Sequence, residues 1–183
     1  MRRRARALCT AVLAAAVAVA STGCGYALVG RGNTLPAYVR IIGIPQFVNQ
    51  SPIENVDVVM TDEVRREFLS RGSFRTQPET EGADAVLRGT ILSVYLEPLA
   101  TNVDRQGSRY TFVVTARIEF VDQHDASKVL WSNPSLRVAE PFDVPADVAA
   151  GDPSAVFRQD QNALERLARV FARSVVTAIL TGD

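Results

Sequence analysis

A strict alternation of apolar and polar side chains over Arg109–Val121 constrains the fold more than any other stretch of the sequence. Successive side chains of a β-strand point to opposite faces of the sheet, so this pattern predicts a strand with one buried face and one largely solvated face. The predicted buried side chains are Tyr110, Phe112, Val114, Ala116, Ile118 and Phe120. Other elements must cover this apolar face.

One amphipathic helix is predicted over Pro52–Arg71. Ser51 followed by Glu54 is typical of a capping box, and Pro52 suits the first helical position. Gly72 is suited to end the helix. The apolar stripe recurs at helical spacing and consists of Val56, Val59, Met60, Val64 and Phe68.

A second amphipathic helix is predicted near the end of the sequence. It follows a loop over residues 140–153, in which Asp152 and Pro153 can cap its start. Its apolar stripe consists of Phe157, Leu164, Leu167, Ala168, Phe171, Val175, Ala178 and Ile179. Arginines lie mainly on the opposite side, and Gly182 is near the end of the helix.

Three further β-branched or apolar runs predict strands. They cover Val39–Ile44, then Ala85–Leu96 with a candidate bulge at Gly89, and finally Lys128–Trp131 with Leu136–Val138. We expect Pro98 to end the second run and polar loops over residues 76–84 and 102–107. Pro134 interrupts the last run, which favours an edge position in the sheet because proline lacks a backbone donor.

The element order β-α-β-β-β-α predicts an α+β (α/β) two-layer sandwich with a four-stranded mixed sheet. The first two strands flank a helix and should be parallel, whereas the remaining strands suit an antiparallel meander. Both helices pack on one face of the sheet, and the other face stays polar. We expect residues 39–183 to form a single domain.

The N-terminus has the layout of a secretory signal. Four arginines precede an apolar run over residues 7–20 that is too short to span a bilayer comfortably. Two cleavage sites are compatible with the pattern. Cleavage after Ala20 would leave Ser21 as the first residue, and cleavage after Gly23 would leave Cys24 first.

The cysteine content favours cleavage before Cys24. The other cysteine, Cys9, lies inside the signal, so Cys24 would be left without a disulfide partner in an oxidising compartment. The segment resembles the lipobox of bacterial lipoproteins, although Ser21 stands where leucine is usual. We therefore expect residues 1–23 to be removed, Cys24 to be acylated, and residues 24–38 to form a tether. Several acyl chains would give stable anchoring, which a single chain would not.

Composition and motifs argue against several functions. Without residues 1–23 the net charge is −4, which argues against nucleic acid binding. His124 is the only histidine, and a metal site with Asp122 and Asp125 is a weaker interpretation than a solvated turn. No catalytic set is apparent. We expect no enzymatic activity, no metal and no cofactor.

Several short motifs, in this order and spacing, resemble the LptE family of lipopolysaccharide-assembly lipoproteins. They lie in Cys24–Gly30, Ile41–Asn49, Thr61–Gly72, Ala83–Ile91 and Lys128–Trp131. The resemblance implies an outer-membrane lipoprotein on the periplasmic leaflet, seated in the lumen of the β-barrel LptD. It implies roles as a plug and assembly factor that binds lipopolysaccharide and helps deliver it to the outer leaflet. Gly25 next to Cys24 agrees with sorting to the outer membrane.

Lipopolysaccharide carries phosphates, so a binding surface should present arginine or lysine. Arg105 and Arg109 beside one hairpin, with Lys128 beside the next, are the candidate residues. An alternative is a periplasmic lipoprotein adaptor with a CsgG/LpoB-like domain, which also opens with a similar strand and helix. Such a protein would activate a cell-wall enzyme or build a secretion pore.

Overall fold

The computed structural model describes residues 34–100, 108–125, 128–144, 154, 156 and 161–182. The chain divides into two units, Met1–Gly32 and Asn33–Asp183, and all elements described here belong to the second. Their bounds are β1 Ile41–Gly43, β2 Val48–Asn49, α2 Val56–Ser70, β3 Arg75–Gln77, β4 Ala85–Ala100, β5 Ser108–Asp122, β6 Val129–Val144 and α4 Gln161–Thr181.

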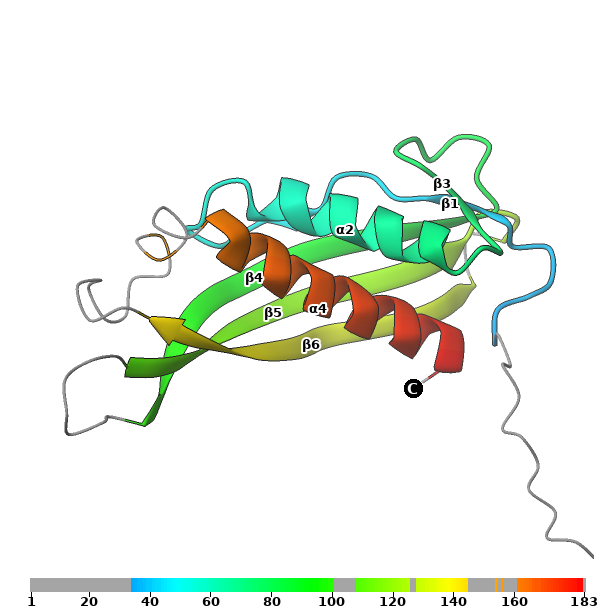
Figure 1. Cartoon of the computed structure of the whole chain (residues 1–183). Coiled ribbons are helices and arrows are strands. Elements are labelled where there is room, and N and C mark those ends of the chain that lie inside the picture. The colour runs from blue at the N-terminus through cyan, green and yellow to red at the C-terminus, as the bar shows by residue number, and fades with distance from the viewer. Residues whose placement is uncertain are drawn as a thin grey trace, which may run out of the picture. The chain divides into compact units, whose positions relative to one another are not determined.

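The two long helices lie side by side over one face of a mixed sheet (Figure 1). The strand order is β3-β1-β4-β5-β6, and β2 pairs with β4. β1 is parallel to β3 and β4, whereas β4, β5 and β6 form the antiparallel meander. The predicted class is thus confirmed, with two short strands in addition to the predicted four.

The two additional strands have too little pattern to be recognised in the sequence. β3 is the polar tripeptide Arg75–Gln77 and falls partly in the predicted loop over residues 76–84. It is a strand because its backbone pairs with β1, as in the bond from the Arg75 amide to the Arg40 carbonyl. β2 has only two residues, which pair with Thr90 and Ile91 of β4.

The start of α2 differs from the prediction. The helix begins at Val56, after Asn55, which adopts a left-handed conformation with φ 60° and makes no side-chain capping bond. Instead of capping a helix, the Ser51 hydroxyl donates to Asn49 Oδ1 and accepts from the Ile53 amide. The capping box is therefore wrong, because Ser51 belongs to a local turn that directs Ile53 into the core. The predicted end is confirmed, with Gly72 at φ 71° just beyond the helix.

Prolines interrupt the long strands less than expected. β4 runs past Pro98 to Ala100, and β6 continues through both Pro134 and Pro141. A register shift lies between Pro98 and Ala100, and another falls where Pro134 is inserted, so each irregularity is absorbed as a bulge. β6 ends the strand order, so the predicted edge position is confirmed. The bulge expected at Gly89 is wrong, because Gly89 pairs in regular register with Ile118 and the nearest shift in β4 lies between Ile91 and Ser93.

The core fills the space between the helices and the sheet. Its largest fully buried side chains include Phe68 of α2, Phe112 and Phe120 of β5, and Phe171 of α4. Each such side chain contributes about 1.5–3 kcal/mol by burial. The apolar face of β5 predicted from the alternation is buried throughout, from Tyr110 to Phe120. Among the described residues, no helix is long and apolar enough to cross a membrane.

Residues just before β1 pack on this core. The Thr34 amide donates to the Leu180 carbonyl at 3.1 Å, and Leu35 and Val39 are buried. The end of the predicted tether is therefore attached to the C-terminal end of α4.

Candidate ligand-binding face

The sheet face opposite the helices is the candidate binding surface, and we call it the open face. Strand alternation and pairing assign its residues. They are Arg88, Thr90, Ser93, Tyr95 and Glu97 of β4, Thr111, Val113, Thr115, Arg117 and Glu119 of β5, and Ser132, Arg137 and Ala139 of β6. Its arginines and Glu119 are exposed, as expected for a polar face.

One part of the open face is covered by its own side chains. Arg137 Nη2 donates to both carboxylate oxygens of Glu97 at 2.9 Å, which joins β6 to β4 across the intervening β5. The pair spans diagonally above Val113, which is fully buried although it lies on the open face. Hydrogen bonding to Tyr95, and then to Glu97, raises the pKa of Arg137 further above its usual value, so this charge is permanent.

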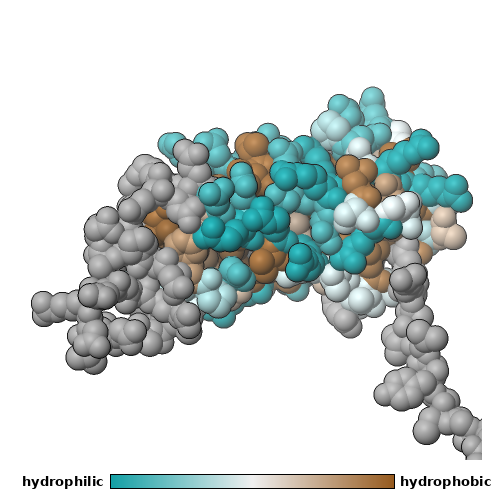
Figure 2. Space-filling model, viewed as in Figure 1, coloured by the Kyte–Doolittle hydropathy of each residue, from teal (hydrophilic) through white to brown (hydrophobic). Residues whose placement is uncertain are grey.

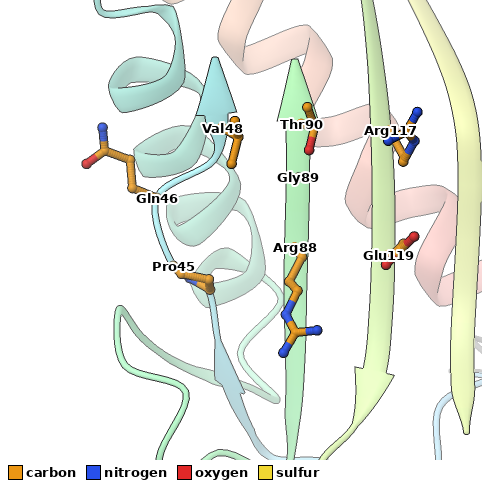
Figure 3. A pocket seen from close by; sticks show the side chains of 8 residues that line it. All are labelled: Pro45, Gln46, Val48, Arg88, Gly89, Thr90, Arg117 and Glu119. Carbon is orange, nitrogen blue, oxygen red and sulfur yellow. The ribbon is translucent and has the colours of Figure 1, made fainter. Parts of the chain in front are cut away.

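A groove of about 340 Å³ opens at the other end of this face (Figure 3). Its lining residues are Pro45, Gln46, Val48, Arg88, Gly89, Thr90, Arg117 and Glu119. It therefore combines charged, polar and apolar side chains from β2, β4, β5 and the segment between β1 and β2.

The groove exists because the strand ladder beside β4 is interrupted. β1 pairs with Ala85 and Val86, and β2 pairs with Thr90 and Ile91, so residues 87–89 have no ladder partner on that side. The chain between β1 and β2 bows away from β4 at this point (Figure 3).

Side chains of α2 hold this bowed segment. Arg65 donates from Nε and Nη2 to the Ile44 carbonyl, and the Phe47 amide donates to Thr61 Oγ1 at 3.0 Å. The helix thus supplies the hydrogen bonds that a continuous ladder would have supplied.

The charged residues of the groove are neighbours across two strands. Arg88 lies opposite Glu119, and Thr90 lies opposite Arg117. Throughout the described ranges, no hydrogen bond or ion pair engages the side chains of Arg88, Arg117 or Glu119. These charges therefore contribute little to holding the fold together and remain accessible to a ligand.

The predicted site residues are not all within the described part of the chain. Cys24 and Arg105 lie outside it. Arg109 is in β5, next to the hairpin that joins β4 and β5, whereas Lys128 is exposed just before β6. They lie at opposite ends of β5, which is about 45–50 Å long at the usual rise per residue. The structure thus does not bring Arg109 and Lys128 into one cluster.

Asp122 and His124 form hydrogen bonds within the fold. Asp122 is almost fully buried, and its carboxylate accepts hydrogen bonds from the Tyr38 hydroxyl and the His124 amide. The bond from Tyr38 is the main cause that lowers the pKa of Asp122. Across the residues described, no group of three metal-ligating side chains is present. Asp122 therefore connects the segment before β1 to the end of β5.

The fold and the groove define a class, namely an α+β sandwich with two helices on one sheet face and exposed charged residues on the other. The sequence model of the LptE family, described as lipopolysaccharide-assembly, matches residues 39–179, and the chain therefore belongs to this family. Comparison with curated protein sequences gives no match.

Solved structures with similarity to this chain have low sequence identity to it. The hypothetical protein CT253 from Chlamydia trachomatis is 11% identical over 79% of this chain and 99% of that chain, with a TM-score of 0.53. Protein XCC0632 from Xanthomonas campestris is 14% identical over 78% and 85% of the two chains, with a TM-score of 0.48. The PelC dodecamer from Paraburkholderia phytofirmans is 13% identical over 81% and 92%, with a TM-score of 0.46. At these identities the first match supports the fold alone.

Proposed function

We propose that the chain is an outer-membrane lipoprotein that plugs and helps assemble the β-barrel LptD and takes part in lipopolysaccharide transport to the outer leaflet. The family match over residues 39–179 is the observation that carries this proposal. The sandwich acts without catalysis, by occupying the barrel and contacting the lipopolysaccharide.

The surface chemistry supports a plug. A domain inside a polar barrel lumen needs polar outer surfaces. The open face provides one, with Arg88, Arg117, Glu119 and Arg137 exposed to solvent. The hydropathy of the helical side, mixed but mainly polar in Figure 2, agrees with this requirement.

The proposed anchor is acylated Cys24 in the periplasmic leaflet of the outer membrane. Because Thr34 is bonded to Leu180, residues 24–33 are what remains to connect the lipid to the packed domain. A chain spans at most about 3.5 Å per residue, so the domain is held within roughly 35 Å of its lipid. This keeps the sandwich beside a barrel in the same membrane.

Depletion of the chain in its own bacterium tests the proposal. We expect less folded LptD in the outer membrane and less lipopolysaccharide at the cell surface, with both restored by the wild-type gene. A matched control is depletion of an unrelated outer-membrane lipoprotein. Normal amounts of folded LptD and of surface lipopolysaccharide after depletion would overturn the proposal.

A further inference from the structure

The groove of the open face holds charged groups that the fold does not use. Arg88 and Arg117 have no ion pair within the described chain, and neither has Glu119. Several other arginines of the described chain, though not all, pair with carboxylates, among them Arg65, Arg66, Arg71 and Arg137. Arg88 and Glu119 are directly opposite each other on β4 and β5 and still form no pair. Both cations of the groove can therefore bind an external anion without breaking a native contact.

Positively and negatively charged side chains alternate along the groove. In Figure 3 the Arg88 side chain runs along β4 toward one end of the groove, and Arg117 extends toward the other. Glu119 lies between their guanidinium groups along this axis. Pro45 and the exposed Val48 form an apolar wall on the side of the bowed segment.

Each part of this layout selects a ligand feature. A guanidinium group binds phosphate or carboxylate through charge-assisted hydrogen bonds. Glu119, Thr90 and Gln46 offer acceptors and donors suited to hydroxyl groups. Glu119 repels a bare anion, so its presence favours a ligand whose anionic groups are separated by hydroxyl-bearing atoms. The apolar wall can contact the C–H face of a sugar ring.

We propose that this groove is a binding site for an anionic saccharide, which carries phosphate or carboxylate groups beside free hydroxyls. The volume of about 340 Å³ is at the lower end of the range for small-ligand sites, which suits one sugar unit. This inference deepens the proposed function, because lipopolysaccharide contains sugars of this kind. It adds a ligand contact on the open face, at the end of β5 opposite to Arg109.

Calorimetric titration of the full-length acylated protein in detergent tests the site. The probes are glucose 6-phosphate, glucuronate, glucose and inorganic phosphate, which separate phosphate, carboxylate, sugar and simple anion. We expect glucose 6-phosphate or glucuronate to bind at least about tenfold more tightly than glucose or inorganic phosphate, as one charge-assisted contact provides. Whichever of the two binds more tightly identifies the anionic group.

Variants assign the binding to the groove. Arg88→Gln combined with Arg117→Gln should weaken binding of the tighter probe by about tenfold or more. Arg137→Gln is the matched control, because Arg137 lies on the same face but is held by Glu97, and it should leave the affinity within about twofold. The thermal melting of each variant is measured alongside.

Three results would overturn the site. These are equal affinity for glucose, equal affinity for inorganic phosphate, and unchanged affinity of a folded Arg88/Arg117 double variant. If the double variant does not fold, Glu119→Gln replaces it and should strengthen phosphate binding, whereas an unchanged phosphate affinity argues against the site. Failure of the groove leaves the proposed function standing if the wild-type protein still binds lipopolysaccharide and LptD. If the wild-type protein binds neither lipopolysaccharide nor LptD, the proposed function is refuted instead.

Discussion

The ring of Phe47 packs directly against Gly89, so closely that a Cβ atom on Gly89 would lie 2.7 Å from three ring carbons. This contact seats the bowed segment between β1 and β2 on β4. It also explains a glycine in the interior of a long strand, where glycine is otherwise unfavourable.

Gly89→Ala should lower the free energy of unfolding by about 1–3 kcal/mol, because the added methyl group overpacks a filled site. Urea denaturation measures the change. In a Phe47→Leu background the same substitution should cost less, since the flat ring is absent, and a double-mutant cycle reports the difference. Equal cost in both backgrounds would show that Phe47 is not the obstacle.

Acid should destabilise the domain through Asp84 and Asp122. Backbone amides of Ile41 and Arg40 lower the pKa of Asp84, and the Tyr38 hydroxyl lowers that of Asp122. A carboxyl group whose folded pKa is depressed stabilises above its unfolded pKa of about 3.9, and this contribution disappears as the pH falls through the folded value. We therefore expect the loss to begin below about pH 4–5.

Thermal melting between pH 7 and pH 3 tests this dependence. Asp84→Asn should lower the melting temperature at pH 7 and reduce its fall toward pH 3. Asp62→Asn on α2 is the control, since it removes a half-exposed carboxylate whose one ion-pair partner in the described chain is Arg65. The assignment fails if Asp84→Asn and Asp62→Asn melt with the same dependence on pH.

Alanine at Arg105, Arg109 and Lys128 together should weaken lipopolysaccharide binding without unfolding the domain. Because Arg109 and Lys128 lie at opposite ends of β5, their effects should add independently. Affinity measurements on the Arg105/Arg109 variant, the Lys128 variant and the triple variant test this. An unchanged affinity in the folded triple variant would remove these residues as ligand contacts.

The N-terminus of the native protein should begin at acylated Cys24. Mass spectrometry of protein purified from membranes measures this directly, and Cys24→Ala should release the protein from the membrane fraction. An unmodified N-terminus at Ser21 would support the alternative cleavage and remove the anchor.

The periodicity of apolar residues predicted the long helices and strands, because burial of one face of an element imposes that periodicity on its sequence. The alternation around Phe112 and the stripe of Met60 and Phe68 each reflect one face turned to the core. Capping residues predicted the start of α2 less well than periodicity predicted the long elements. The Ser51 hydroxyl bonds to the nearby Asn49 side chain instead of capping the helix.

The groove could not be predicted from the sequence. It depends on which strands pair and on where the ladder is interrupted, and both are long-range relationships. Arg88 and Arg117 each look like an ordinary polar position of a strand, and only the antiparallel register of β4 and β5 brings them together. The resemblance to LptE was carried instead by the order of short motifs, and the family match confirmed it.

Co-purification tests the proposed role most directly. The full-length tagged chain is isolated from detergent-solubilised membranes of its own bacterium, and its bound proteins are identified by mass spectrometry. We predict recovery of LptD in near-equal amount, together with lipopolysaccharide. Recovery of a peptidoglycan synthase or of a pore-forming oligomer, without LptD, would contradict the account.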